Sequence, residues 1–352
     1  MTSSTSLPLV LVIGATGHTG GSIVRGLVAS GNFVSCFHLR LLRSYPPDAY
    51  SFIVQRVAAL VRPASQTKPN TEALRASGVE IRLGDLTDGV AKLKEILVGV
   101  DIVISAVIAS AIKSQKDIIH AAKEVGVKRF VPCDFGTPGK RGVRHLLDEK
   151  LEIRDLIKEL GVPHTFIDVG WWMQLSLPLP TRSAVPDAWK AVTYALHGPG
   201  GLKMLVTNLQ HIGVFVARIV ADARTLNQAV IVWEDELTQL EAHEIGERAS
   251  GEADVLKAKR THHTAEDIKK FSEQADAAVA KDPTSYLAHA MQSQNEYMYS
   301  IHVLGENTLA NAKALGYLDA QELYPDLPKL TLEEFAKEYY SLPEPGQEFL
   351  GV

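Results

Sequence analysis

The chain has 352 residues, of which 46% are hydrophobic and 22% charged, with a formal net charge of −5 and two cysteines. This apolar content excludes a disordered chain, and two cysteines exclude a disulfide-stapled scaffold. The small negative charge, without a long basic run, argues against direct contact with nucleic acid. Met1–Ser6 carries no positive charge and no apolar run reaches about 20 residues, so we expect neither a signal peptide nor a membrane span. The sequence therefore predicts a cytoplasmic globular protein.

Strands and helices alternate through the first half of the chain. Short aliphatic runs predict strands at Leu7–Ile13, Arg56–Val61, Val79–Leu83, Asp101–Val107, Lys128–Pro132 and His164–Val169. Helical patterns lie between them, at Ile23–Val28, Thr71–Ala76, Val90–Leu97, Lys113–Glu124 and Leu146–Leu160. This alternation predicts an α/β fold with a doubly wound parallel sheet and right-handed crossovers.

The second half is more polar and mostly helical. Helices are predicted at Leu237–Ala249, Ala265–Ala280, Tyr286–Ser300 and Leu332–Tyr340. Thr264 with Asp267, and Thr331 with Glu334, have the spacing of capping boxes at two of these helix starts.

Three apolar runs in the second half predict further strands. Val192–Leu196 and Leu202–Val206 flank the glycine-rich His197–Gly201, an arrangement typical of a β-hairpin. Gln228–Trp233 is predicted to return to the parallel sheet as one more strand.

A glycine-rich loop follows the first strand, at Gly14-Ala15-Thr16-Gly17-His18-Thr19-Gly20. A dinucleotide pyrophosphate needs backbone N–H groups at a helix N-terminus and no side chain blocking its approach. The glycines supply that access, and the hydroxyls of Thr16 and Thr19 can add contacts. The spacing is G-x-x-G-x-x-G, and its place between the first strand and helix favours a dinucleotide site over a ligand-free tight turn.

The end of the second strand indicates which dinucleotide binds. An acidic residue there would hold a ribose diol, whereas an arginine suits a 2'-phosphate. Arg62 follows the strand and Lys68 lies nearby, without an acid, so NADP(H) is favoured over NAD(H). Asp85, after the third strand, either accepts from the adenine amine or caps the next helix.

Motifs along nearly the whole chain resemble the NmrA-like, isoflavone reductase-like group of atypical short-chain dehydrogenases. They are the glycine loop, Leu60–Pro63, Gly84–Leu86, Ile104–Val107, Gln115 with Ala121–Lys123, Val127–Gly136, Asp148–Lys150, Arg224–Asn227 and Glu322–Asp326. The chain is similar to phenylcoumaran benzylic ether and pinoresinol-lariciresinol reductases. Two departures are mild, since Cys133 replaces the usual serine and Asp134 the usual glutamate. Thr137–Arg144 is shorter than in the plant enzymes, which implies a different substrate shape.

The resemblance makes Lys150 the candidate catalytic residue, because Asp148-Glu149-Lys150 falls at the family's D-E-K motif. A lysine beside the nicotinamide can act as a general acid/base, although most helix lysines are solvated. Leu146 stands where a classical short-chain dehydrogenase has tyrosine, which argues against simple alcohol oxidation. The resemblance also implies cofactor contacts, at His18, Ser105, Ala106, Gln115, Phe135 and Gly136.

Other polar and aromatic residues near the predicted site have weaker interpretations. Trp171 and Trp172 follow the sixth strand and form either an aromatic wall for a planar substrate or interdomain packing. Cys133 is interpreted as a small buried residue rather than a reactive thiol. His262-His263 and His243-Glu244 lack metal-ligand spacing, so we expect surface histidines and no metal site.

The segment Val34–Gln55 does not fit the resemblance. Its deletion would join Asn32-Phe33 directly to Arg56-Val57, the family's ordinary junction between first helix and second strand. It begins with Val-Ser, codable as GTGAGT or GTAAGT, and ends with Gln, codable as CAG, which are the ends of a spliceosomal intron. We hypothesise a translated retained intron or a gene-model error, the alternative being a genuine surface insertion.

Residues 1–170 are therefore interpreted as an NAD(P)-binding Rossmann domain and 171–352 as a smaller, mostly helical α/β substrate lobe. The predicted function is an NADPH-dependent reductase that transfers hydride to a small aromatic or conjugated substrate, with Lys150 as general acid/base. The alternative is a non-catalytic, NmrA-like redox sensor that binds dinucleotide and acts through a protein partner. A homodimer is compatible with either function.

Overall fold

The computed structural model describes residues 8–31, 56–327 and 329–346, and the chain divides into two compact units. The first unit comprises Met1–Phe135, Glu149–Ile167 and Gln210–Val230. The second unit comprises Gly136–Asp148, Asp168–Leu209 and Ile231–Val352. The hypothesised insertion, Val34–Gln55, lies outside the described residues.

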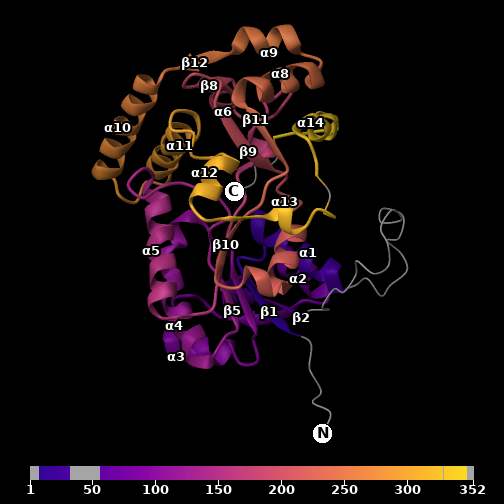
Figure 1. The fold of residues 1–352 in the computed structure, drawn as a ribbon, viewed down its shortest axis with the longest axis vertical. Coiled ribbons are helices and arrows are strands. Elements are labelled where there is room, and N and C mark those ends of the chain that lie inside the picture. The colour runs from indigo at the N-terminus through magenta and orange to yellow at the C-terminus, as the bar shows by residue number, and fades with distance from the viewer. Residues whose placement is uncertain (1–7, 32–55, 328, 347–352) are drawn as a thin grey trace. The chain divides into compact units, whose positions relative to one another are not determined.

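A five-stranded parallel sheet forms the centre of the first unit, with strand order β3-β2-β1-β4-β5. Figure 1 labels β5, β1 and β2 of this sheet. Its strands are β1 (Leu9–Ile13), β2 (Arg56–Val61), β3 (Glu80–Leu83), β4 (Ile102–Ser105) and β5 (Arg129–Val131). Every residue of β1 and β4 is buried, as expected for central strands covered on both faces. The strand order reverses between β1 and β4, and ligands of such sheets bind at the carboxyl ends of the strands there. The predicted α/β fold with a doubly wound parallel sheet is confirmed.

Beyond β5, an isolated parallel bridge joins Phe130 to His164, next to β6 (Thr165–Asp168). The strand β10 (Gln228–Ile231) is hydrogen-bonded to β6. Buried Arg129 ties this region together, since its guanidinium donates to the Thr165 and Thr225 hydroxyls at 3.2 and 2.8 Å. It also donates to the carbonyls of Ile219 and Asp222, each at 2.8 Å.

Helices of the first unit connect these strands. They are α1 (His18–Gly31), α2 (Pro69–Ala76), α3 (Gly89–Ile96), α4 (Lys116–Val125), α5 (His145–Glu159) and α7 (Ile212–Ala221), with short helices η2 (Pro63–Ser65), η3 (Ala109–Ala111), η4 (Lys113–Gln115) and η6 (Ala223–Thr225). The first turn of α5, residues 145–148, belongs to the second unit. Helices α1 and α7 pack backbone to backbone, because a Cβ on Gly26 would strike the backbone of Gly213.

The strands of the second unit correct one prediction. They are β7 (Trp171–Trp172), β8 (Ala195–His197), β9 (Lys203–Thr207), β11 (Asp235–Thr238), β12 (Thr261–His263) and β13 (Leu318–Asp319). The predicted hairpin is wrong, because β8 pairs with β12, whereas β9 pairs with β11 and β7. Gly198 turns the chain away at φ +61°, and its N–H donates to the carbonyl of His263 instead of a β9 residue. Pairing with distant strands therefore overrides the local turn signal.

Helices contain more residues of the second unit than strands do, and α10 runs beside α11 (Figure 1). They are η5 (Met173–Leu175), α6 (Asp187–Thr193), α8 (Gln239–Ser250), α9 (Ala253–Lys259), α10 (Ala265–Lys281), α11 (Tyr286–His302), α12 (Leu309–Ala314), α13 (Ala320–Leu323) and α14 (Leu332–Ser341). Both predicted capping boxes are confirmed, with Thr264 and Asp267 at the start of α10 and Thr331 and Glu334 at the start of α14.

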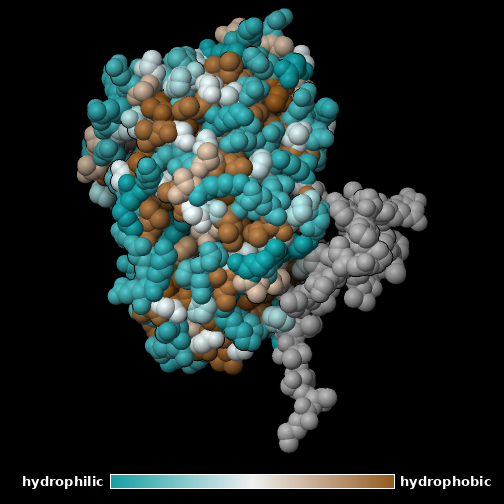
Figure 2. Space-filling view, viewed as in Figure 1, coloured by the Kyte–Doolittle hydropathy of each residue, from teal (hydrophilic) through white to brown (hydrophobic). Residues whose placement is uncertain are grey.

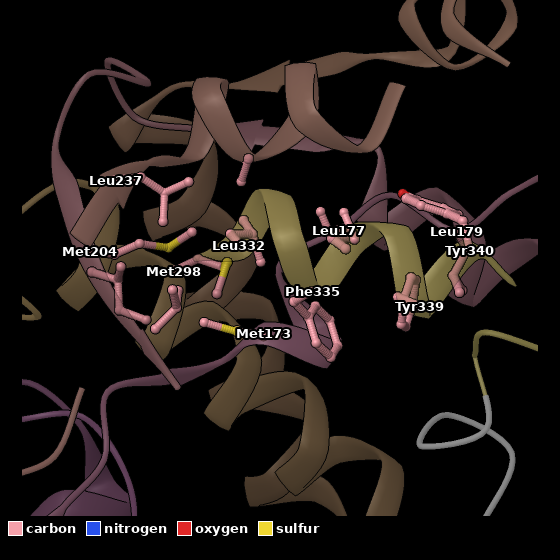
Figure 3. Packing of buried hydrophobic residues seen from close by; sticks show 14 of the residues in the cluster. Met173, Leu177, Leu179, Met204, Leu237, Met298, Leu332, Phe335, Tyr339 and Tyr340 are labelled. Atoms are coloured by element: carbon pink, nitrogen blue, oxygen red, sulfur yellow. The ribbon is translucent and has the colours of Figure 1, made fainter. Parts of the chain in front are cut away.

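The core of the second unit gathers side chains from distant segments (Figure 3). Leu332, Phe335 and Tyr339 lie on one face of α14, at the i, i+3, i+7 spacing of an amphipathic helix. Met204 of β9 and Met298 of α11 belong to the same cluster. A flexible thioether can fill irregular gaps between strand and helix layers.

On the face drawn in Figure 2, hydrophobic and hydrophilic residues of the described part of the chain are interspersed, as on most protein surfaces. Among the described residues, no helix is both long and apolar enough to cross a membrane.

Candidate functional site

The glycine loop joins β1 to α1 and takes its shape from two of its glycines. Gly14 has φ +77°, and a Cβ there would strike the carbonyl oxygen of Ala106. A Cβ on Gly20 would strike the carbonyl oxygen of Gly14. Gly17 is different, because its Cβ would make only ordinary contact, at 3.4 Å from the Gly14 oxygen. Packing alone therefore explains Gly14 and Gly20 but not Gly17.

The unexplained part of the loop is also its exposed part. Thr16, Gly17 and His18 are exposed and Thr19 is half-buried, at the point where α1 begins. A helix N-terminus presents backbone N–H groups and a positive dipole end, which favour phosphate. An exposed glycine at this point allows an anion to approach the backbone closely.

The next loop at this sheet edge contains a buried hydroxyl. Ser105 ends β4 opposite Ile13, the last residue of β1, and the N–H of Ala106 donates to the Ile13 carbonyl at 2.8 Å. The Ser105 hydroxyl is fully buried and has no hydrogen-bond partner within the described residues. Buried polar groups in proteins nearly always have a partner, so this orphan fits a site that a bound ligand completes.

Arg62 and Lys68 follow β2 with exposed side chains. Arg62 precedes η2 and Lys68 precedes α2, and neither side chain makes a capping hydrogen bond. Asp85 accepts from the Thr87 N–H and hydroxyl, at 3.0 and 2.8 Å. These bonds, together with the charge of Arg62, lower the pKa of Asp85. The carboxylate thus already serves the turn that precedes α3.

Gln115 is buried at the end of η4, and both ends of its amide bind backbone. Its Oε1 accepts from the N–H of Cys133 at 3.0 Å, and its Nε2 donates to the carbonyl of Ile112 at 2.9 Å. The side chain therefore holds the loop after β5 against η4.

The loop after β5 is fixed in an unusual conformation. Phe135 is buried and has φ +37°, and its N–H donates to the Ile167 carbonyl at 2.9 Å. Burial raises the pKa of the Cys133 thiol to about 11, so the thiol stays protonated near neutral pH. The interpretation of Cys133 as a small buried residue is confirmed. The next residue, Gly136, accepts from the Val169 N–H at 2.8 Å within the second unit.

Lys150 lies half-buried on α5, next to this loop. Its ammonium donates to the carbonyl oxygen of Asp134 at 2.6 Å. One turn further along α5, Arg154 Nε lies 3.0 Å from Asp134 Oδ1, and both of these side chains are buried. β1, β4 and β5 are parallel, so the glycine loop, Ser105 and the Asp134–Lys150 contact lie at the same carboxyl edge of the sheet.

The tryptophans belong to the second unit, where β7 pairs with β9. Trp171 packs against the core of that unit, its ring centroid 5.3 Å from that of Tyr297. Its indole N–H points to the Leu175 carbonyl at 3.4 Å. Trp172 is half-buried, and its carbonyl accepts from the Ser176 hydroxyl at 2.9 Å. Packing within the second unit thus explains the position of Trp171.

One prediction about histidines is wrong. His243 is 3% exposed instead of lying at the surface. The sequence holds no clear signal for this, because the buried face of α8 also carries the polar Gln239 and Glu247 and so lacks the apolar stripe of an amphipathic helix. Arg154 is a second residue that the sequence reasoning missed.

His243 lies near further buried histidines of the second unit. The rings of His197 and His302 stack with centroids 5.8 Å apart, and His263 meets His197 edge-on at 5.3 Å. Burial lowers the pKa of His197 and of His243 to about 4, and that of His302 to about 3. These rings are therefore neutral near neutral pH.

Comparison with known proteins identifies relatives along nearly the whole chain. Asnovolin J 5',6'-dehydrogenase from Aspergillus novofumigatus is 34% identical over 336 residues, which cover 94% of each chain. Phenylcoumaran benzylic ether reductase IRL1 from Ginkgo biloba is 29% identical, over 94% of this chain and 98% of its own. The leucoanthocyanidin reductase–NADPH complex from Vitis vinifera has the same fold, with a TM-score of 0.71 at 24% identity, over 95% of this chain and 100% of its own.

Residues 7–336 match the family model described as NmrA-like. The glycine loop, the orphaned Ser105 hydroxyl and the D-E-K lysine all fall inside this range. The chain belongs to the NmrA-like family.

Proposed function

We propose that this protein is an NADPH-dependent oxidoreductase that moves hydride between the nicotinamide and a small conjugated or aromatic substrate, with Lys150 as general acid/base. The observation that carries the proposal is the Lys150 ammonium, bound to the Asp134 carbonyl at the sheet edge that also bears the glycine loop. Relatives named as a dehydrogenase and as reductases, and a structural neighbour that contains NADPH, support the same reaction class.

The proposed cofactor contacts use groups at this edge. Backbone N–H groups at the start of α1 would bind the pyrophosphate, apart from that of Gly17, which already donates to the Gly14 carbonyl at 3.0 Å. The exposed Arg62 and Lys68 would pair with a 2'-phosphate. The buried Ser105 hydroxyl, which has no partner among the described residues, would gain one. Ala106 and Phe135 would border the nicotinamide, and Gln115 would support that wall by holding Cys133. When bound, the cofactor supplies or accepts the hydride.

Lys150 would handle the proton. When a hydride adds to a carbon conjugated with a carbonyl or quinone-like group, negative charge develops on the substrate oxygen. An ammonium held beside the nicotinamide can donate its proton there, and in the reverse direction the amine accepts the proton. The bond to the Asp134 carbonyl aims the lysine without neutralising its charge, because a carbonyl is an uncharged acceptor.

A screen in both directions tests the proposal, because relatives carry names of both reductases and a dehydrogenase. NADPH consumption is measured with enones, quinones, isoflavones and lignan-type ethers, and NADP+ reduction with their saturated counterparts. Turnover of at least one class supports the proposal. Tight NADPH binding without turnover of any class would contradict it and favour a redox sensor that acts through a protein partner.

A further inference from the structure

We propose that Arg154 is a positioning residue for Lys150, which acts through Asp134 to hold the ammonium in place and to balance its electrostatic surroundings. The inference deepens the proposed function, since it concerns the lysine assigned there as proton carrier. The contacts that carry it all lie within the first unit.

Helical spacing places the side chains of Lys150 and Arg154 next to the same residue, Asp134. Residues four apart on a helix are neighbours on one face, so Lys150 and Arg154 project from α5 in the same direction. Both reach Asp134, the lysine at the backbone oxygen (2.6 Å) and the arginine at the carboxylate (3.0 Å). One loop residue thus links the two side chains.

Burial makes this link rigid. The Asp134 side chain is 1% exposed and that of Arg154 is 8% exposed, and the guanidinium also lies 4.9 Å from the ring centroid of Phe166. Removal of one partner from a buried ion pair leaves an uncompensated charge, which is strongly destabilising locally. Arg154 therefore fixes the residue whose carbonyl receives the lysine, while the N–H of Phe135 is held by Ile167.

The same pair controls the charge around Lys150. The Asp134 carboxylate and Cys133 come from the loop after β5, and this thiol is neutral because its pKa is about 11. From α5 come Arg154 and two glutamates, Glu149 and Glu152, both of which pair with Lys113 of η4. The negative charge of Asp134 favours the ammonium form of Lys150 and the positive charge of Arg154 opposes it, so the two act on the lysine with opposite signs.

The opposite charges of Asp134 and Arg154 predict opposite changes in the pKa of Lys150 when either residue is replaced. In Asp134→Asn the guanidinium stays charged, so the pKa of Lys150 should fall. In Arg154→Met the carboxylate is left without its partner, so the pKa of Lys150 should rise. The double variant should return close to wild type, and Arg154→Lys should remain closer to wild type than Arg154→Met.

The measurement is the pH dependence of Lys150 acylation by an amine-reactive reagent, followed by mass spectrometry on the full-length protein. Arg129→Lys is the matched control, because Arg129 is as buried as Arg154, at 6% exposed, yet binds hydroxyls and carbonyls away from Lys150. It should leave the pKa of Lys150 unchanged. Circular dichroism selects folded variants, and the nearly isosteric Asp134→Asn keeps the test available if Arg154→Met does not fold.

Opposite shifts in the two single variants support the inference. If Arg154 had a purely structural role, both single variants would loosen the loop after β5, and the pKa of Lys150 would move in both towards that of a solvated lysine. A shift in the same direction in both variants, or no shift in folded variants, would overturn the inference. Labelling needs neither NADPH nor substrate, so it is independent of the proposed function. Opposite shifts together with a Lys150→Met variant of unchanged turnover would leave the positioning intact and remove the catalytic assignment.

Discussion

The buried histidines of the second unit should make the free energy of unfolding steeply dependent on pH. His197, His243 and His302 have pKa values lowered by burial to about 4, 4 and 3. Neutrality is built into their contacts, since the Gln239 amide N–H donates to His197 Nδ1 at 3.2 Å and so requires a lone pair there. The perturbation is a change from pH 7.0 to pH 5.5.

The sign follows from proton uptake. A histidine in the unfolded chain has a pKa near 6.5, whereas these three rings do not bind a proton in the folded chain until the pH is much lower. The unfolded chain therefore binds more protons, and stability falls as the pH drops below about 6.5. Between pH 7.0 and 5.5, each ring loses about 1.2 kcal/mol of stability by this linkage. Three rings lose about 4 kcal/mol together, a large share of the roughly 5–15 kcal/mol that stabilises a typical domain.

Urea denaturation at the two pH values measures this loss, with tryptophan fluorescence and circular dichroism as probes. His243→Leu supplies the decisive variant, because His243 Nδ1 has no hydrogen-bond partner within the described residues and the ring is 3% exposed. It should reduce the pH-dependent loss by about one third, or about 1.2 kcal/mol. His289→Leu, at an exposed position on α11, should not change the loss. Equal stability at the two pH values, or an unchanged slope in His243→Leu, would refute the reasoning.

Three further predictions concern the glycine loop, an ion pair and the extra segment. Gly17→Ala should fold normally but bind NADPH at least about tenfold more weakly, whereas Gly14→Ala should lose stability because its Cβ would clash with Ala106. A normal NADPH affinity of Gly17→Ala, measured by calorimetry, would argue against a pyrophosphate at the loop. The hydrogen bond and charge of Glu296 raise the pKa of His145, so this pair stabilises the fold below the unfolded pKa and its contribution is lost as the pH rises through the folded value. Glu296→Gln should lower the pKa of His145 in an NMR titration, and an unchanged titration would assign the raised pKa to other groups. Deletion of Val34–Gln55 should leave NADPH affinity and circular dichroism unchanged, because the loops of the proposed site follow the carboxyl ends of β1, β4 and β5, whereas this segment precedes β2. Lost NADPH affinity, or a dominant transcript that contains the segment, would contradict the intron hypothesis.

The parallel sheet could be predicted because the sequence pattern of each strand lies within a short stretch of the chain. Each buried strand, such as Leu9–Ile13, is a continuous aliphatic run followed by a turn and a helical pattern, and the order of such units fixes the sheet class. The capping boxes at Thr264 and Thr331 are equally local, since donor and acceptor lie three residues apart.

The errors come from contacts between distant residues. The glycine-rich turn after His197 favours a hairpin locally, but β8 pairs with β12, more than sixty residues further along the chain. Arg154 reads as an ordinary charged helix residue until Asp134, twenty residues earlier, is seen to occupy the same buried space. His243 is a similar case, because the buried face of α8 also carries Gln239 and Glu247 and so forms no apolar stripe in the sequence.

The part of the site that the sequence predicts best is the backbone of the glycine loop. Gly14 and Gly20 are required by close backbone approach, so their spacing reports the loop conformation directly. The side chains around Lys150 were less predictable, because their arrangement depends on the positive φ of Phe135 and on the orientation of Asp134.

The central claim is that Lys150 carries the proton of a hydride-transfer reaction, and the Lys150→Met variant tests it most directly. NADPH affinity and turnover are measured on the same preparation with a substrate from the screen, alongside Lys116→Met, which removes an exposed lysine of α4. The account predicts unchanged NADPH affinity and a loss of turnover of at least about 100-fold in Lys150→Met, with turnover retained in Lys116→Met. Wild-type turnover in Lys150→Met would contradict it.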